Sequence, residues 1–547
     1  MEINNKSSRL FSKCNIIELL IFSCGIIFLF LMRIYNQEGV YLENDSYQYL
    51  SVAQNFLNGE FAKTSIIHFD SERSHLIIPA PLTTFPFGYS LIIALISLVG
   101  IPLEWSSFVV SIFVIFGTVL YIQYLSSSLL LANISKYFLY FWILFNSVLY
   151  VFSSALLTEY LFTFLSTTAV IFIMISMKSD KDKSSYLMYL LIANLLIGMA
   201  FLVRYAGIFL FVSVVAYYLV QWGRTRVRYY YHGILCSILS FVIIGSILIR
   251  NIILVGNWKG GNTLSGGNTL ENILRDYVVS MHHIIFGMEV PVQFGYIEVF
   301  LAISCLLIMY YLYKYIIIGR KDLKNIDQII FVLIYILLYS IFMLYAGLNS
   351  PISFSPRMFV PVIPVIGILL SIIISNIDNI IINKKTKKVF FLSITTFLIC
   401  YSVINLKSFA VEKKAGCDKR LKMHLEGNKD ILGWILNNTQ TDDVFISNNG
   451  HAFQYLTKRN TVSLVSPEYS SVEWGLDNIV DVILDFNVSY ITIFKSDICS
   501  SSSNGISNLL VNGLTKNINK FAWLESVVDN ENVYLYKINK DYLPKNK

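Results

Sequence analysis

The sequence predicts a polytopic α-helical membrane protein with a water-soluble α/β domain at its C-terminus, on the basis of three observations. Hydrophobic residues make up 55% of the 547 positions and charged residues only 14%, which lies outside the range of soluble globular proteins. Apolar runs long enough to cross a bilayer as helices, which takes about 20 residues each, recur through residues 1–406. Beyond residue 407 the hydropathy falls, and short β-rich runs alternate with helix-like segments.

The membrane body is predicted to contain roughly twelve helices by this length rule. The first apolar run follows Lys6, Arg9 and Lys13 and has no small-residue cleavage site after it, so we interpret it as a retained anchor. The apolar runs lie at 15–34, 86–103, 105–128, 136–177 (room for two helices), 186–203, 205–222, 229–250, 295–318, 327–347, 357–377 and 387–406.

Basic loops between these helices indicate the orientation, because cytoplasmic loops are enriched in Lys and Arg. Four such loops lie at 178–183, 224–228, 320–324 and 384–388. The N-terminus is therefore expected in the cytoplasm, and the segment 407–547 on the extracytoplasmic side of what we take to be the plasma (inner) membrane. A formal charge of +7, much of it in these loops, argues against a nucleic-acid partner.

Two long loops, 36–85 and 251–294, are then expected to face outward. Four helices are counted between the first of them and the basic loop at 178, whereas the topology requires an odd number. The stretch 86–177 must therefore hold one crossing more or one fewer, and the total becomes 11 or 13 helices.

The segment 407–547 is predicted to be an α/β domain. Strands are expected at 444–447, 462–465, 490–494 and 533–538, and helices at 430–437 and 472–486. The segment has no GxGxxG, no Walker loop and no zinc pattern, so we predict no nucleotide or metal site in it. A lid or docking platform over the membrane body is the expected role. Cys417 and Cys499 could pair in an oxidising compartment.

The first outer loop contains acidic residues at the start of a predicted surface helix. Glu43 and Asp45 precede a stretch to Asn58 that has apolar residues on one face, as in helices that lie along a membrane surface. Asp45 can be an N-cap, a catalytic acid at the level of the lipid headgroups, or both.

Three arginines are predicted at the outer boundary, against the usual distribution of positive charge. Arg204 lies at a junction of two helices, Arg250 ends a helix that leads into the second outer loop, and Arg357 opens the helix that leaves the third. Ionisable groups at membrane depth are costly and usually face a cavity or a partner, and guanidinium groups bind phosphate oxygens bidentately. The three predict an anionic ligand; alternatively, each reaches the interface or pairs with a loop acid.

Glu159 is expected at the outer start of an apolar helix, where an acid also interacts favourably with the helix dipole. The pair His282 and His283 has no further ligand spacing. The repeated Gly-Gly-Asn-Thr-Leu at 260–264 and 266–270 is flexible sequence, which either gates access of substrate or is simple slack.

In this order, these segments resemble the GT-C superfamily of lipid-dependent glycosyltransferases, of the kind that includes protein O-mannosyltransferases and aminoarabinose transferases. The resemblance covers nearly the whole chain. The matching segments are Asp45-Ser46-Tyr47-Gln48-Tyr49, Phe85-Pro86-Phe87-Gly88-Tyr89-Ser90-Leu91, Thr158-Glu159, Val203-Arg204-Tyr205-Ala206-Gly207, Arg250-Asn251 and Arg357-Met358-Phe359-Val360-Pro361. Many relatives have an acidic pair where this chain has Asp45-Ser46, so a second carboxylate must come from Glu43 or Glu159.

The resemblance implies a polyprenyl-phosphate sugar as donor, a lipid, glycan or protein as acceptor, and membrane lipid around the body. Asp45 would be the general base of an inverting transfer, with Glu159 as a second catalytic carboxylate. Glu43, Tyr47, Tyr89, Arg204, Arg250 and Arg357 are the candidate substrate-binding residues, the arginines neutralising the departing lipid phosphate. No cofactor is specified, and a divalent metal stays open.

Two other functions fit a protein of this class. A transporter or flippase also uses about twelve helices, but no repeat relates the two halves, and the charges gather at one face. A polymerase or ligase that joins whole glycans would share the donor chemistry and differ in its acceptor.

Overall fold

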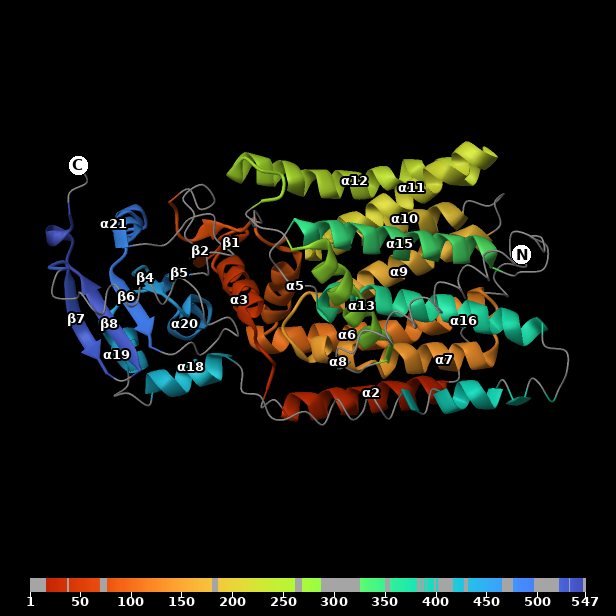
Figure 1. The fold of residues 1–547 in the computed structure, drawn as a ribbon, viewed down its shortest axis with the longest axis horizontal. Helices are drawn as coiled ribbons and strands as arrows, with labels where there is room; N and C mark the ends of the chain where they lie inside the picture. Colours follow the sequence, from red (N-terminus) through yellow and green to blue (C-terminus); the bar gives the residue numbers. More distant parts are fainter. Residues whose placement is uncertain are drawn as a thin grey trace.

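The structure is a computed structural model, and it describes residues 16–36, 39–68, 76–179, 185–260, 268–286, 325–349, 355–380, parts of 385–401, 417–426, 431–464, 476–495, 521–530 and 532–544. Figure 1 shows two parts along the long axis, a helical bundle and a smaller α/β domain at one of its ends.

Within these residues six helices are long and apolar enough to cross a membrane, or seven if one bent pair counts as a single span. The bent pair is α7 (Asn133–Leu144) with α8 (Ser147–Ser154), which meet at 48°. The predicted run 295–318 lies outside the described residues. The six are α6 (Leu103–Ser128), α9 (Glu159–Lys178), α10 (Ser185–Val203), α11 (Gly207–Thr225), α12 (Arg228–Val255) and α15 (Ile326–Leu348).

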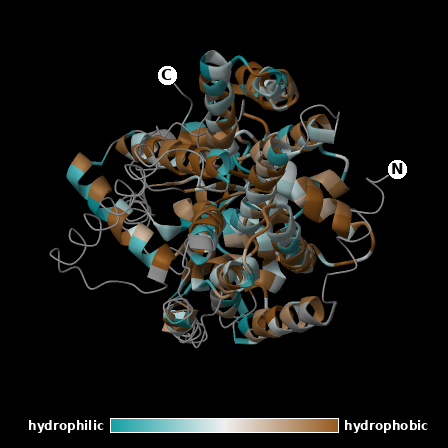
Figure 2. Cartoon of the chain, turned by 90° about the vertical axis from the view of Figure 1, so that its right-hand side faces the viewer, coloured by the Kyte–Doolittle hydropathy of each residue, from teal (hydrophilic) through white to brown (hydrophobic). Residues whose placement is uncertain are grey.

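Further apolar helices complete the bundle. They are α2 (Ile16–Asn36), α5 (Gly88–Ser97) and α16 (Val362–Ile380). Seen along the bundle in Figure 2, hydrophobic ribbon surrounds the peripheral helices and is not confined to their inner faces. Such a distribution suits helices surrounded by lipid. The structure thus confirms the predicted class, a polytopic helical membrane protein with a C-terminal α/β domain.

The run at 86–103 does not form the long helix that its composition predicts. Helix α5 has only 10 residues, about 15 Å at 1.5 Å per residue, which is half of the hydrocarbon thickness. Gly100, with φ of 91°, and Pro102, the N-cap of α6, interrupt the helical backbone. Three crossings, namely α6, the pair α7 and α8, and α9, then separate the first loop from Lys178, which removes the parity conflict.

The bend between α7 and α8 has a defined polar centre at Asn146. Its side chain accepts a hydrogen bond from the Leu149 amide at 3.1 Å and donates to the Tyr401 hydroxyl at 2.8 Å and the Ile284 carbonyl at 2.9 Å. Asn146 is fully buried, so these bonds satisfy groups that lipid could not.

The α/β domain is built on a six-stranded sheet of order β2-β5-β4-β6-β8-β7. Strands β2, β5, β4 and β6 are parallel, and β8 and β7 pair antiparallel. The elements are α18 (Cys417–Glu426), α19 (Ile431–Asn438), β4 (Val444–Ser447), α20 (Gly450–Thr457), β5 (Asn460–Ser463), α21 (Leu476–Asp485), β6 (Tyr490–Phe494), β7 (Leu524–Asp529), β8 (Val533–Ile538) and the 3-10 turn η4 (Lys540–Tyr542).

One edge strand of this sheet comes from the first long loop of the bundle. Strand β2 (Ile66–His68) pairs in parallel with β5, with Ile66 opposite Thr461 and Ile67 opposite Val462. In the same loop β1 (Lys63–Thr64) pairs with β3 (Ala80–Pro81). The loop and the C-terminal segment therefore share one hydrogen-bonded sheet.

Two helices lie outside the set of parallel crossings. Helix α3 (Asn44–Leu57) lies between the bundle and the sheet, beside α5 and α20. Helix α13 (Leu270–Phe286) crosses the bundle and packs on α15 and on the 3-10 turn η1 (Pro356–Phe359). Elements α3 and η1 contribute residues to the candidate site.

Candidate active site

A cluster of carboxylates and guanidinium groups lies at the end of the bundle that faces the α/β domain. Its members come from four separate segments: the start of α3, the start of α9, the turn after α10, and η1. No two of these segments are neighbours in the sequence, so only the fold brings the charges together.

Helix α3 presents Asp45 to the cluster without using it as the cap. Glu43 is the N-cap, and its backbone amide donates to the Ser46 hydroxyl at 2.9 Å. Asp45 lies in the first turn, where a carboxylate interacts favourably with the helix dipole. The alternative in which Asp45 serves as the N-cap is therefore wrong, and its carboxylate is available for other contacts.

Glu159 is the buried centre of the cluster. It is the first residue of α9, and its side chain is only 1% exposed. It forms ion pairs with Arg204 and with Arg357 through the same oxygen, Oε1. Arg204 also donates to the Thr158 hydroxyl at 3.2 Å. A buried carboxylate requires such compensation, since an unpaired charge away from water is very costly.

Arg357 links Glu159 to the acids of α3. Its Nη2 donates to Asp45 Oδ2 at 2.5 Å, and its Nη1 lies 3.7 Å from Glu43 Oε2. Burial alone would lower the pKa of Arg357, but Glu159 and Asp45 raise it well above its usual value. Burial raises the pKa of Glu43, and Arg357 partly offsets this effect.

The position of Arg357 is fixed by the residues next to it in η1. The Tyr339 hydroxyl on α15 donates to the Met358 carbonyl at 2.8 Å. Phe359 is fully buried, with its ring 5.2 Å from that of Tyr277 on α13. These contacts hold the short turn on both sides of its guanidinium group.

Arg250 lies at the same end of the bundle but in a different environment. It donates to the Leu82 carbonyl at 2.8 Å and to the Ala62 carbonyl at 3.4 Å, and it lies 5.6 Å from the centre of the Phe87 ring. Among the residues that the structure describes, no carboxylate is paired with it. Its charge is therefore not neutralised, unlike the charges of Arg204 and Arg357.

The tyrosines near the start of α3 lie in different environments. The Tyr47 ring packs 5.5 Å from that of Tyr455 on α20, so Tyr47 contacts the α/β domain. Tyr49 lies near the charges of the cluster, and burial, Asp45 and Glu159 raise its pKa. Its ring lies 5.4 Å from that of Tyr89, edge to face. The sequence analysis missed Tyr49 as a site residue.

The sequence matches no protein-family model and no curated protein. Solved structures resemble the fold, and three of them are described here. ArnT from Cupriavidus metallidurans in the apo state shares 10% identity over 96% of this chain and 99% of that chain, with a TM-score of 0.57. The same protein bound to undecaprenyl phosphate gives 11% identity, the same coverage and a TM-score of 0.56.

The third is the oligosaccharyltransferase AglB from Archaeoglobus fulgidus, in complex with an inhibitory peptide and a dolichol-phosphate. It shares 12% identity over 95% of this chain and 74% of that chain, with a TM-score of 0.52. The chain has the GT-C fold. The expectation drawn from the ordered motifs is thereby confirmed at the level of the fold.

Within this GT-C fold, four of the predicted site residues converge directly: Asp45, Glu159, Arg204 and Arg357. Glu43 lies at the edge of the cluster, and Tyr89 reaches it through Tyr49. Arg250 bonds to backbone carbonyls of the first loop, and Tyr47 packs on the α/β domain.

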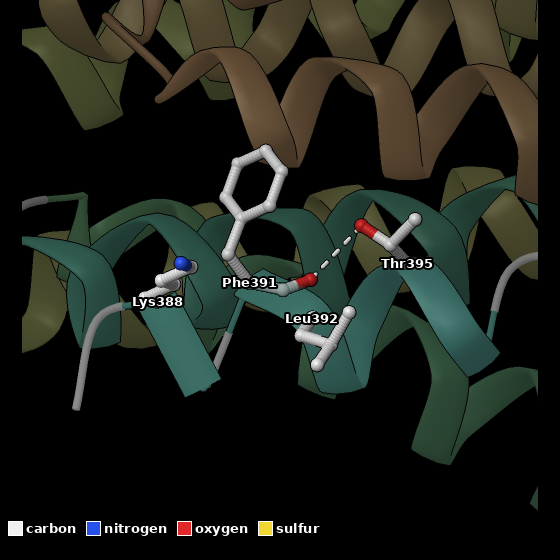
Figure 3. A pocket seen from close by; sticks show the side chains of 4 residues that line it. All are labelled: Lys388, Phe391, Leu392 and Thr395. Atoms are coloured by element: carbon white, nitrogen blue, oxygen red, sulfur yellow. Dashed lines mark hydrogen bonds between the residues drawn. The ribbon is translucent and has the colours of Figure 1, made fainter. Parts of the chain in front are cut away.

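A surface hollow elsewhere in the GT-C fold is unrelated to this cluster. It is lined by Lys388, Phe391, Leu392 and Thr395, with Thr395 donating to the Phe391 carbonyl at 2.9 Å (Figure 3). All four come from one helical stretch near the bundle end that lies away from the α/β domain. The hollow carries one charged group, so it does not offer the chemistry of the cluster.

Proposed function

We propose that this chain is a membrane glycosyltransferase that moves a sugar from a polyprenyl-phosphate donor to an acceptor at the end of the bundle facing the α/β domain. The observation that carries the proposal is the convergence of Asp45, Glu159, Arg204 and Arg357 at that end of a GT-C fold. Support for the donor class comes from fold neighbours solved with undecaprenyl phosphate and with dolichol-phosphate.

Asp45 is the proposed general base. Its Oδ2 is bound to Arg357, whereas no described residue binds Oδ1, and the side chain is 29% exposed. An acceptor hydroxyl would give its proton to Oδ1 as its oxygen attacks the anomeric carbon. The bond from that carbon to the phosphate oxygen breaks, the electron pair leaves with the lipid phosphate, and the anomeric centre inverts.

The leaving phosphate needs positive charge, and Arg250 is the arginine best placed to supply it. Arg204 and Arg357 are already engaged by carboxylates, whereas the charge of Arg250 has only carbonyl partners. Its neighbour Asn251 donates to the Tyr205 hydroxyl at 2.9 Å, which connects α12 to the turn that holds Arg204. We therefore propose Arg250 as the first phosphate contact, with the unbonded edge of Arg204 as the second.

Sidedness follows from the same proposal. Nucleotide sugars are made in the cytoplasm, so a transferase whose site faces outward needs a donor already carried across the membrane, and a polyprenyl-phosphate sugar meets that need. We propose that the α/β domain lies on the extracytoplasmic side of the plasma membrane and covers the acceptor. The acceptor itself is a lipid, a glycan or a protein.

The test is an in vitro transfer assay in proteoliposomes with a labelled polyprenyl-phosphate sugar and a panel of acceptors. Transfer from this donor, with none from the matching nucleotide sugar, is the expected result. Replacing Arg250 by Met should raise the donor KM by roughly 10- to 100-fold, since a charge-assisted hydrogen bond contributes about 1.5–3 kcal/mol. Transfer from the nucleotide sugar alone would refute the proposed donor class.

A further inference from the structure

Arg357 contacts three carboxylates that come from two distant parts of the chain. Its Nε pairs with Glu159, its Nη2 with Asp45 at 2.5 Å, and its Nη1 lies 3.7 Å from Glu43. Every nitrogen of the guanidinium group therefore faces an acid. Arg204, the other cation of the cluster, reaches only Glu159 among these three.

The charge count shows why a cation is needed at this position. With all five groups ionised, three carboxylates and two guanidinium groups leave one excess negative charge. Without Arg357 the excess would be two, around a Glu159 side chain that is 1% exposed. Carboxylate groups gathered in this way are ordinary ligands of Mg²⁺ or Ca²⁺, which supply the compensating charge in many proteins.

Here the three acids are arranged around the guanidinium group of Arg357. Among the residues that the structure describes, no three His, Cys, Asp or Glu side chains are placed to hold a metal. The guanidinium group is anchored by η1, whose Met358 carbonyl accepts the Tyr339 hydrogen bond at 2.8 Å. A divalent ion in ligand contact with these acids would have to displace a tethered positive charge.

We infer that Arg357 is the resident counter-cation of the reaction centre, so that the transfer reaction of this chain needs no divalent metal ion. This inference rests on the proposed function. One test of it measures sugar transfer, and a second test measures the response of protein stability to Mn²⁺ and needs no sugar donor. Arg357 gathers Asp45, Glu159 and Glu43 and thereby positions the proposed base, while its charge balances theirs.

The kinetic test compares the wild-type protein with the Arg357→Ala variant in the transfer assay. Wild-type turnover should not change when a chelator is added. The variant should lose turnover by at least 100-fold and regain part of it with millimolar guanidinium or Mn²⁺, but not with the same ionic strength of NaCl. The matched control is Lys422→Ala, which removes an exposed cation 3.5 Å from Glu426 in the α/β domain and should keep the wild-type turnover with or without these cations.

An unfolding temperature and a conservative variant provide two further tests of the inference. Mn²⁺ should raise the unfolding temperature of Arg357→Ala and leave that of the wild type unchanged, which requires no donor. If Arg357→Ala does not fold, Arg357→Lys should fold and transfer sugar in the presence of chelator. Loss of wild-type turnover in chelator, or no recovery of Arg357→Ala with either guanidinium or Mn²⁺, would overturn the inference. No transfer from any donor, with the Mn²⁺ response intact, would refute the proposed function alone.

Discussion

The buried carboxylate of Glu159 determines how the other charges of the cluster can be arranged. A glutamate at the start of a helix is stabilised by the helix dipole, but at 1% exposure this is not sufficient compensation. Arg204 and Arg357 supply the remaining compensating charge, and both come from segments other than α9. Asp45, at 29% exposure, keeps one oxygen for a reactant. Burial thus separates a structural acid from the proposed reactive one.

Replacing Glu159 by Gln should lower the free energy of unfolding by about 3–5 kcal/mol, because breaking a buried pair leaves its partners uncompensated. Chemical unfolding in detergent micelles measures this change. The matched control is Glu426→Gln, which removes an exposed acid 3.5 Å from Lys422. That control should cost less than about 1 kcal/mol. Equal effects at the two positions would show that the cluster does not hold the bundle together.

At the level of single residues, the sequence analysis had already named the four residues that converge in the cluster: Asp45, Glu159, Arg204 and Arg357. Arg204 and Arg357 were singled out because a positive charge at an outer helix boundary indicates an anionic ligand or a paired acid, and in the structure both pair with Glu159. Tyr49 was missed, although its spacing of four residues from Asp45 puts both on one face of α3. Arg250 could not be separated from the other arginines, because its carbonyl partners carry no signal in the sequence.

Among the elements, β2 has the largest effect on how the site is built. Its three residues join the first loop to the C-terminal sheet, and the Thr461 amide donates to the Ser65 carbonyl at 2.9 Å. Helix α3 precedes this strand and bonds to it, since the Gln48 side chain donates to the Ile66 carbonyl at 3.2 Å. A movement of the α/β domain would therefore be transmitted to the helix that carries Asp45.

The backbone amides of β2 (Ile66–His68) that bond to β5 should exchange hydrogen more slowly than amides of exposed segments, because sheet hydrogen bonds protect them. Hydrogen exchange followed by mass spectrometry on the intact protein measures this directly. Exchange as fast as at the exposed residue Trp258, which is 51% exposed, would show that the strand does not stay in the sheet.

The sequence could not predict β2, because three residues are too few for a periodic pattern and the partner strand lies almost 400 residues later. Strands β4, β6 and β8 were predicted within their observed bounds, since each is a distinct β-rich run between polar segments. Helix α5 shows the opposite case: its apolar composition predicts a span, whereas Gly100 and Pro102 end the helix early.

At the scale of the whole molecule, the carboxylate and arginine cluster lies at the end of the bundle that faces the α/β domain (Figure 1). Lys178 and Arg224 end α9 and α11, and the positive-inside bias assigns such basic ends to the cytoplasm. The account therefore requires the cluster and the α/β domain to be extracytoplasmic.

Cysteine labelling tests this orientation. In a background without the native cysteines, Lys495→Cys in the α/β domain should react with a membrane-impermeant maleimide in intact cells. Arg224→Cys, at the end of α11, should react only after the cells are permeabilised. The reverse pattern would place the proposed site on the cytoplasmic side, where the reason for a lipid-linked donor disappears.

The most direct measurement of the central claim is the single-turnover rate of sugar transfer from a labelled polyprenyl-phosphate donor by the Asp45→Asn variant. We expect this rate to fall by roughly 10²- to 10⁴-fold, the usual contribution of a general base, with unchanged donor binding. Asn44→Ala, a change at the exposed neighbouring position of the same helix turn, should keep the wild-type rate. Full turnover by Asp45→Asn would contradict the assignment of Asp45 as the general base.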